Sequence, residues 1–88
     1  MKISIWDIKA SSEDGMIMHF DIIVPINITN EKVVSTYAND YLKKNFFSTS
    51  QLTSSKCSFC QIESRSPHII GQIHNTGYGV DEVKNYNT

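Results

Sequence analysis

Residues 2–25, KISIWDIKASSEDGMIMHFDIIVP, predict a β-hairpin at the start of the chain. Two runs within this stretch, Lys2–Ile8 and Met16–Val24, are rich in the β-branched and aromatic residues that strands favour. Between them, Asp14 and Gly15 indicate a tight turn, because both residues tolerate a positive φ angle. The short connection predicts antiparallel pairing. Pro25 is expected to end the pairing because proline has no amide hydrogen to donate.

The two predicted strands bring polar residues to one side of the hairpin. Side chains alternate between the two faces of a strand, so His19 and Asp21 share a face that the apolar residues Phe20 and Ile22 do not. Asp7 of the first strand would join them. A cluster of Asp7, His19 and Asp21 would let a carboxylate orient and charge the histidine for acid–base chemistry. We favour the simpler interpretation, in which an amphipathic strand exposes its polar face to water.

Two helices and two more strands are expected after the hairpin. A helix over Asn30–Lys44 has an apolar stripe at helical spacing, and Asn30 is a suitable N-cap. We expect Phe46 and Phe47, just beyond it, to fill the core below the helix. Thr53–Ile62 predicts a third strand. Ser66 and Pro67 begin a second helix whose buried stripe is Ile69, Ile70 and Ile73 and which ends near Gly77, and Tyr78–Val83 predicts a fourth strand.

The order β-β-α-β-α-β predicts an α+β fold. The expected architecture is a two-layer sandwich, in which both helices cover one face of a mixed four-stranded sheet. Residues 1–84 would form a single domain and residues 85–88 a frayed tail. The second face of the sheet would be open to water or to a partner.

Composition limits the classes of partner. The chain has 88 residues and a formal net charge of −1, which argues against a nucleic-acid binder because such proteins need a basic face. No run of like charges indicates a membrane-surface patch. The N-terminus does not resemble a signal peptide, and no apolar stretch is long enough to span a bilayer. We therefore expect a cytoplasmic protein.

The motif CSFC at residues 57–60 raises two chemical alternatives. Cys57 and Cys60 would supply half of a zinc site, for which His19 or His68 would be the third ligand. Residues three apart on a strand point to opposite faces, so both thiols reach one ion only if the chain bends. A thiol-redox pair normally lies at a helix N-terminus, whereas the next helix is expected at Pro67. We favour two reduced cysteines in a strand, with no cofactor unless zinc binds.

Four segments together resemble the bacterial Domain of Unknown Function 2024 family. They are WDI at 6–8, MHFDIIVP at 18–25, KCSFCQIE at 56–63 and TGYGVDEV at 76–83, which cover nearly the whole chain. The resemblance implies a small single-domain α+β protein and supplies no reaction. The family pattern continues C-x-F-C-H-x-E, but here Gln61 replaces the histidine while Glu63 is kept. This departure weakens a metal site at the motif, because glutamine is a poor zinc ligand.

The leading functional hypothesis is a non-enzymatic binding or interaction domain. A protein partner, a small ligand or a second copy of the chain would cover the open sheet face. The first alternative is a zinc-binding domain that uses Cys57 and Cys60. The second is a small enzyme, which would use the two thiols for redox chemistry or His19 with Asp7 or Asp21 for acid–base chemistry.

Overall fold

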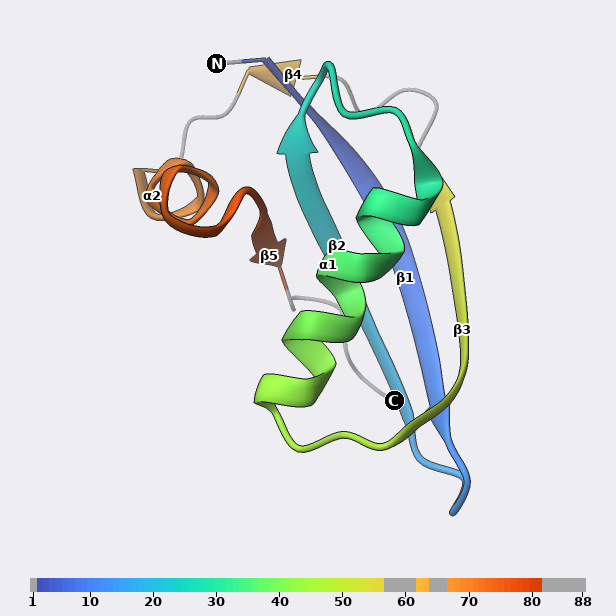
Figure 1. Cartoon of the computed structure of the whole chain (residues 1–88). Coiled ribbons are helices and arrows are strands. Elements are labelled where there is room, and N and C mark those ends of the chain that lie inside the picture. Colours follow the sequence, from blue (N-terminus) through green and yellow to red (C-terminus); the bar gives the residue numbers. More distant parts are fainter. Residues whose placement is uncertain (1, 57–61, 64–66, 82–88) are drawn as a thin grey trace.

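The computed structural model describes residues 2–56, 62–63 and 67–81, and it begins with the expected hairpin. Strands β1 (Lys2–Ser12) and β2 (Ile17–Pro25) pair in antiparallel fashion, with Ile5 opposite Ile23 (Figure 1). Gly15 adopts a φ angle of 90° in the connecting turn. β1 runs on to Ser12, beyond the predicted end at Ile8, because its last residues find partners on both neighbouring strands.

The predicted first helix is present as α1 (Glu31–Lys44). The side chain of Asn30 accepts a hydrogen bond of 2.8 Å from the amide of Lys32, so Asn30 is the N-cap as expected. The buried residues Val34, Ala38 and Leu42 form one stripe, which faces the sheet. After the helix, Phe47 packs against the core, but Phe46 is 95% exposed. The prediction that both phenylalanines fill the core is therefore wrong for Phe46.

All strand pairs in the described part of the chain are antiparallel, so the predicted mixed sheet is wrong. The remaining strands are β3 (Thr49–Lys56), β4 (Ile62–Glu63) and β5 (Gly79–Asp81). The order across the sheet is β3-β1-β2-β5, and β4 also pairs with β1. Helix α1 connects β2 to β3, which run in the same direction. They would form a parallel pair if they were neighbours, but β1 lies between them and is antiparallel to both.

The predicted third strand, Thr53–Ile62, overlaps two strands of the described chain, and residues 57–61 lie outside the described residues. β3 begins earlier, at Thr49, and its last residue Lys56 lies opposite Trp6 of β1. β4 resumes the pairing with Ile62 opposite Ile3. The described residues contain one more strand than predicted.

Two hydrophobic clusters occupy opposite faces of the β1–β2 pair. The larger lies beneath α1 and consists of Trp6, Ile8, Ala10, Phe20, Ile22, Val24, Val34, Ala38, Leu42 and Tyr78. The smaller consists of Ile3, Ile23 and Ile73, with Ile5 and Ile69 packed against it. Residues paired across β1 and β2 share a face, and Ile3, Ile5 and Ile23 belong to the face that α1 does not cover.

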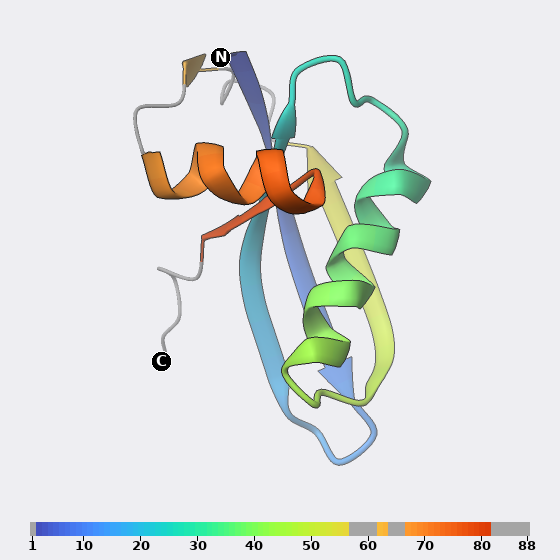
Figure 2. The same cartoon turned by 60° about the vertical axis from the view of Figure 1, so that its left-hand side comes forward.

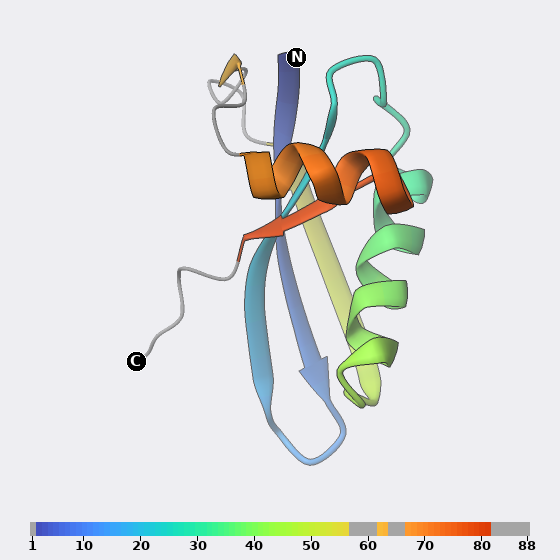
Figure 3. The same cartoon turned by 90° about the vertical axis from the view of Figure 1, so that its left-hand side faces the viewer.

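The prediction that both helices cover one face is therefore wrong. Helix α2 (Pro67–Thr76) packs against the face that α1 does not cover. Its isoleucines Ile69 and Ile73 pack against the smaller cluster, and the helix crosses the edge of the sheet beside β5 (Figures 2 and 3). The apolar residues at the start of β1 need cover on that face, and α2 supplies it. Neither described helix is long and apolar enough to cross a membrane.

Candidate functional site

On the face opposite α1, the part of the sheet nearer the hairpin turn carries polar side chains that neither helix buries. The register places Asp7 between Ser55 and Asp21 in one row across three strands. The next row holds Lys9 between Thr53 and His19. We call these residues the polar sheet face: Asp7, Lys9, His19, Asp21, Thr53 and Ser55. All but the half-buried Asp21 are exposed.

Asp7 and His19 contact each other within this face. They are diagonal neighbours on β1 and β2, and the Nε2 atom of His19 is hydrogen-bonded to Oδ1 of Asp7. Their side chains are 53% and 44% exposed. Because water screens charges at such exposure, the pair contributes little to folding stability. Its chemical value is to hold an imidazole in a defined orientation beside a carboxylate, within reach of a ligand.

Asp21, the third member of the sequence-predicted cluster, lies directly opposite Asp7. Asp81 of β5 lies on its other side, which sequence reasoning missed. Like charges in directly opposed positions destabilise a sheet, but Asp21 and Asp81 each take part in other interactions within the chain. The residues that the structure describes include no group of three or more His, Cys, Asp or Glu side chains arranged to hold a metal ion.

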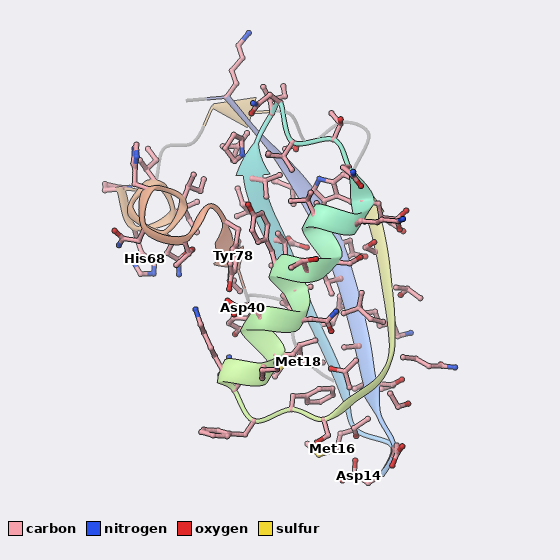
Figure 4. The ribbon with its side chains drawn as sticks, in the orientation of Figure 1. Asp14, Met16, Met18, Asp40, His68 and Tyr78 are labelled. Carbon is pink, nitrogen blue, oxygen red and sulfur yellow. The ribbon has the colours of Figure 1, made fainter. Side chains whose placement is uncertain are left out.

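Of the residues of the hypothetical zinc site, only the two histidines lie in the described part of the chain. Cys57 and Cys60 lie outside the described residues. His19 is separated from Lys56, the residue before Cys57, by two strand spacings across the sheet and three residues along it. That separation is about 14 Å between Cα atoms. His68 is exposed in the first turn of α2, on a different element (Figure 4).

A second polar network joins α1 to the turn between α2 and β5. The hydroxyl of Tyr78 donates a 2.7 Å hydrogen bond to Oδ2 of Asp40, which also contacts Nζ of Lys44 at 3.1 Å (Figure 4). The bond from Tyr78, and then Lys44, lower the pKa of Asp40. Burial, and then Asp40, raise the pKa of Tyr78. The ring of Tyr78 also stacks on that of Tyr37, with 4.7 Å between the ring centroids. These contacts hold the segment before β5 against α1, so the network is structural.

Gly77 allows the chain to bring Tyr78 against Tyr37 and Asp40. Its φ angle is 94°, in the left-handed region that favours glycine. A Cβ atom at this position would lie 2.8 Å from the hydroxyl oxygen of Tyr37. The expectation that Gly77 ends the second helix is borne out by its backbone conformation, and the close approach to Tyr37 adds a steric reason for glycine.

Comparisons with known proteins agree with this fold. The model of a domain of unknown function, DUF2024, matches residues 1–83. The NMR structure of protein NE1680 from Nitrosomonas europaea is similar, with a TM-score of 0.76 and 22% sequence identity, over 99% of this chain and 100% of that one. At this identity the likeness shows the fold alone. The curated proteins include no match. Because the family model covers almost the whole chain, this protein belongs to the Domain of Unknown Function 2024 family.

Proposed function

We propose that this chain is a non-enzymatic binding domain that uses its polar sheet face to contact another protein. The observation that carries the proposal is the arrangement of charges across β1 and β2. Asp7 and Asp21 lie opposite each other in one row, and Lys9 and His19 lie opposite each other in the next. Two rows of different charge on one face favour a partner whose charges complement both rows.

The shape of the surface favours a protein partner over a small molecule. Sites for small molecules are mostly concave and apolar, whereas this surface is a sheet face lined with charged and hydroxyl groups. The side chains project from paired strands, and such rigid elements lower the entropy lost on binding. Thr53 and Ser55 supply hydrogen-bonding groups on the β3 side of the charged rows.

Acid–base catalysis by His19 is a second candidate, and the hydrogen bond between His19 and Asp7 favours it. A catalytic pair works best where water is excluded, because electrostatic interactions are then stronger. His19 and Asp7 are both about half exposed, at 44% and 53% of their side-chain surface. This exposure supports ligand contact more than proton transfer, and we rank binding first.

Selection from a random peptide display library tests the proposal. We expect selected peptides to bind the wild-type chain and to lose at least about tenfold in affinity, or about 1.4 kcal/mol, with Lys9→Glu or His19→Ala. Lys32→Glu is the matched control, because Lys32 is exposed on α1, which covers the opposite face of the sheet. Rising salt should weaken the binding. If the peptides bind Lys9→Glu and His19→Ala as tightly as the wild type, the assignment of the polar sheet face is wrong.

A further inference from the structure

Phe46 lies in a conformation and an environment that the isolated chain does not explain. Its φ angle of 59° is in the left-handed region, where a side chain is crowded by the following carbonyl. Its amide donates to the carbonyl of Lys43 at 3.0 Å, and the amide of Phe47 donates to that of Leu42 at 2.9 Å. This is the Schellman pattern of a helix end, in which glycine usually occupies the position of Phe46. The side chain is also 95% exposed, so packing within the chain does not account for it.

A second large apolar side chain is exposed at the same end of the molecule. Met16 is 61% exposed and directly follows the turn of the hairpin, whereas the exposed Ile17 pairs with Ser11 and lies on the sheet face opposite α1. Ser12 next to this turn pairs with Thr49, which closely follows Phe46 in the chain, so the hairpin turn and the end of α1 lie at one end of the fold (Figures 1 and 4). We call Met16 and Phe46 the apolar end. Strained residues with exposed apolar surface are found at interaction sites.

Opposite charges flank the apolar end. On the hairpin side, Glu13 and Asp14 are exposed, and on the helix side Lys43 and Lys44 are exposed. Asp14 accepts a hydrogen bond from Ser12, and Lys44 contacts Asp40, so each is partly engaged within the chain. Glu13 and Lys43 are therefore the charges on which the argument rests. A surface with an acidic side and a basic side is complementary to its own copy when that copy is rotated by 180°.

We propose that a second copy of this chain docks on the apolar end about a two-fold axis. The hairpin turn of each protomer then lies against the end of α1 in the other, so Phe46 meets Met16, and Glu13 meets Lys43. Contacts between methionine sulfur and aromatic rings are favourable. Two apolar side chains from each protomer make a small interface, below about 1,200 Å² in total, so the dimer is weak and depends on concentration. The polar sheet face remains free, which makes this assembly independent of the proposed binding function.

Sedimentation equilibrium of the full chain, from about 10 μM to about 1 mM, tests the first step, since small interfaces of this kind are weak. We expect the wild type to move from monomer to dimer over this range and Phe46→Gly to stay monomeric. The same substitution should raise the urea midpoint of unfolding, because glycine relieves the left-handed strain. A wild type that is monomeric throughout, or a Phe46→Gly variant that dimerises equally well, would contradict the proposal.

Charge reversal tests the two-fold arrangement itself. Glu13→Lys sets two lysines against each other across the proposed contact, and Lys43→Glu sets two glutamates against each other. Each variant alone should therefore dimerise at least about threefold more weakly at low salt. An equimolar mixture of the two variants should associate better than either one, because both charged contacts are restored between unlike protomers. Lys32→Glu and His19→Ala are the controls and should dimerise like the wild type.

The outcomes separate a second copy from other occupants. If the mixture associates no better than the single variants, the two-fold pairing of Glu13 with Lys43 is wrong. If the wild type stays monomeric but binds vesicles of anionic lipid through Phe46, the apolar end faces a membrane and the dimer proposal fails. If the apolar-end variants abolish dimerisation while the polar-face variants abolish only peptide binding, both proposals stand and the two surfaces are independent.

Discussion

The two faces of the β1–β2 pair are made by alternate residues of the same strands, but they have different surroundings. Beneath α1, Ile8, Phe20 and Ile22 are each 0% exposed. On the opposite face, Asp7 and His19, the neighbours of Ile8 and Phe20 in the chain, are about half exposed. A difference of one residue along the strand thus separates a packed core from a surface. Stability should depend on the first face and on the smaller hydrophobic cluster, and binding should depend on the polar sheet face.

The largest effect is expected when Phe20 is truncated. Phe20 is fully buried, and its ring lies 4.8 Å from that of Tyr41 on α1. Phe20→Ala should lower the free energy of unfolding by about 3–5 kcal/mol, a large part of the roughly 5–15 kcal/mol typical of a domain. Urea unfolding followed by circular dichroism measures this. If the variant does not fold, Ile22→Val should still lose about 0.5–1.5 kcal/mol. Unchanged stability in both variants would contradict the burial of this face.

A smaller loss is expected from Ile73→Ala, which tests where α2 packs. Ile73 is 6% exposed and contacts Ile3 and Ile23 on the face opposite α1. We expect a loss near the lower end of the roughly 2–5 kcal/mol seen for such truncations. A double-mutant cycle sharpens the test: Ile73→Val should couple to Ile23→Val and not to Ile8→Val, which lies on the other face. The reverse result would place α2 beside α1.

The hydrogen bond between Tyr78 and Asp40 should make the free energy of unfolding depend on pH in both the acidic and the basic range. Asp40 has a lowered pKa, so its contribution is present above the ordinary value of 3.8 and is lost as pH falls through the folded value. Tyr78 has a raised pKa, so its contribution is present below the ordinary value of 10.0 and is lost as pH rises. Tyr78→Phe removes the donated hydroxyl, retains the ring on Tyr37, and should cost about 1 kcal/mol or less near neutral pH.

Urea unfolding at a series of pH values measures this dependence. The wild type should lose stability below about pH 4 and above about pH 10, near the ordinary pKa values of aspartate and tyrosine. Tyr78→Phe should lose less in both ranges. Asp40 then lacks the hydrogen bond that chiefly lowers its pKa, and the hydroxyl whose pKa is raised by burial, and then by Asp40, is absent. Lys44→Gln is a useful control, since it removes the second contact of Asp40 but leaves Tyr78 in place. Parallel pH curves for the wild type and Tyr78→Phe would show that the bond is not formed in solution.

Local signals in the sequence predicted the hairpin and α1. Alternation in Met18–Val24 separates the two faces, Asp14 and Gly15 place the turn, and Asn30 caps the helix. The same local signals brought Asp7 and His19 to one face, because a short turn leaves little freedom in how the strands pair. Each of these features depends on residues close together in the chain.

Features that depend on distant partners were not predicted. The end of β1 at Ser12 depends on pairing with Thr49, and the place of Asp81 beside Asp21 depends on the register of β5. Helix α2 packs on the face opposite α1 because the isoleucines of β1 and β2 on that face are not buried by α1. Phe46 was expected in the core because of its type, but the left-handed turn at the end of α1 directs it outward. Residue type alone does not specify that direction.

The smallest effect on stability is expected from the polar sheet face. The hydrogen bond between His19 and Asp7 joins two side chains that are 44% and 53% exposed, and exposed pairs contribute about 0–1 kcal/mol. His19→Ala and Asp7→Asn should each change the free energy of unfolding by less than about 0.5 kcal/mol. The neighbouring Phe20→Ala, one position along the strand, should change it at least about sixfold more. Urea unfolding of all three variants under one set of conditions measures this ratio. A loss of more than about 2 kcal/mol for His19→Ala would mean that the Asp7–His19 pair supports the fold, and the residues of the binding surface would then have to be sought elsewhere.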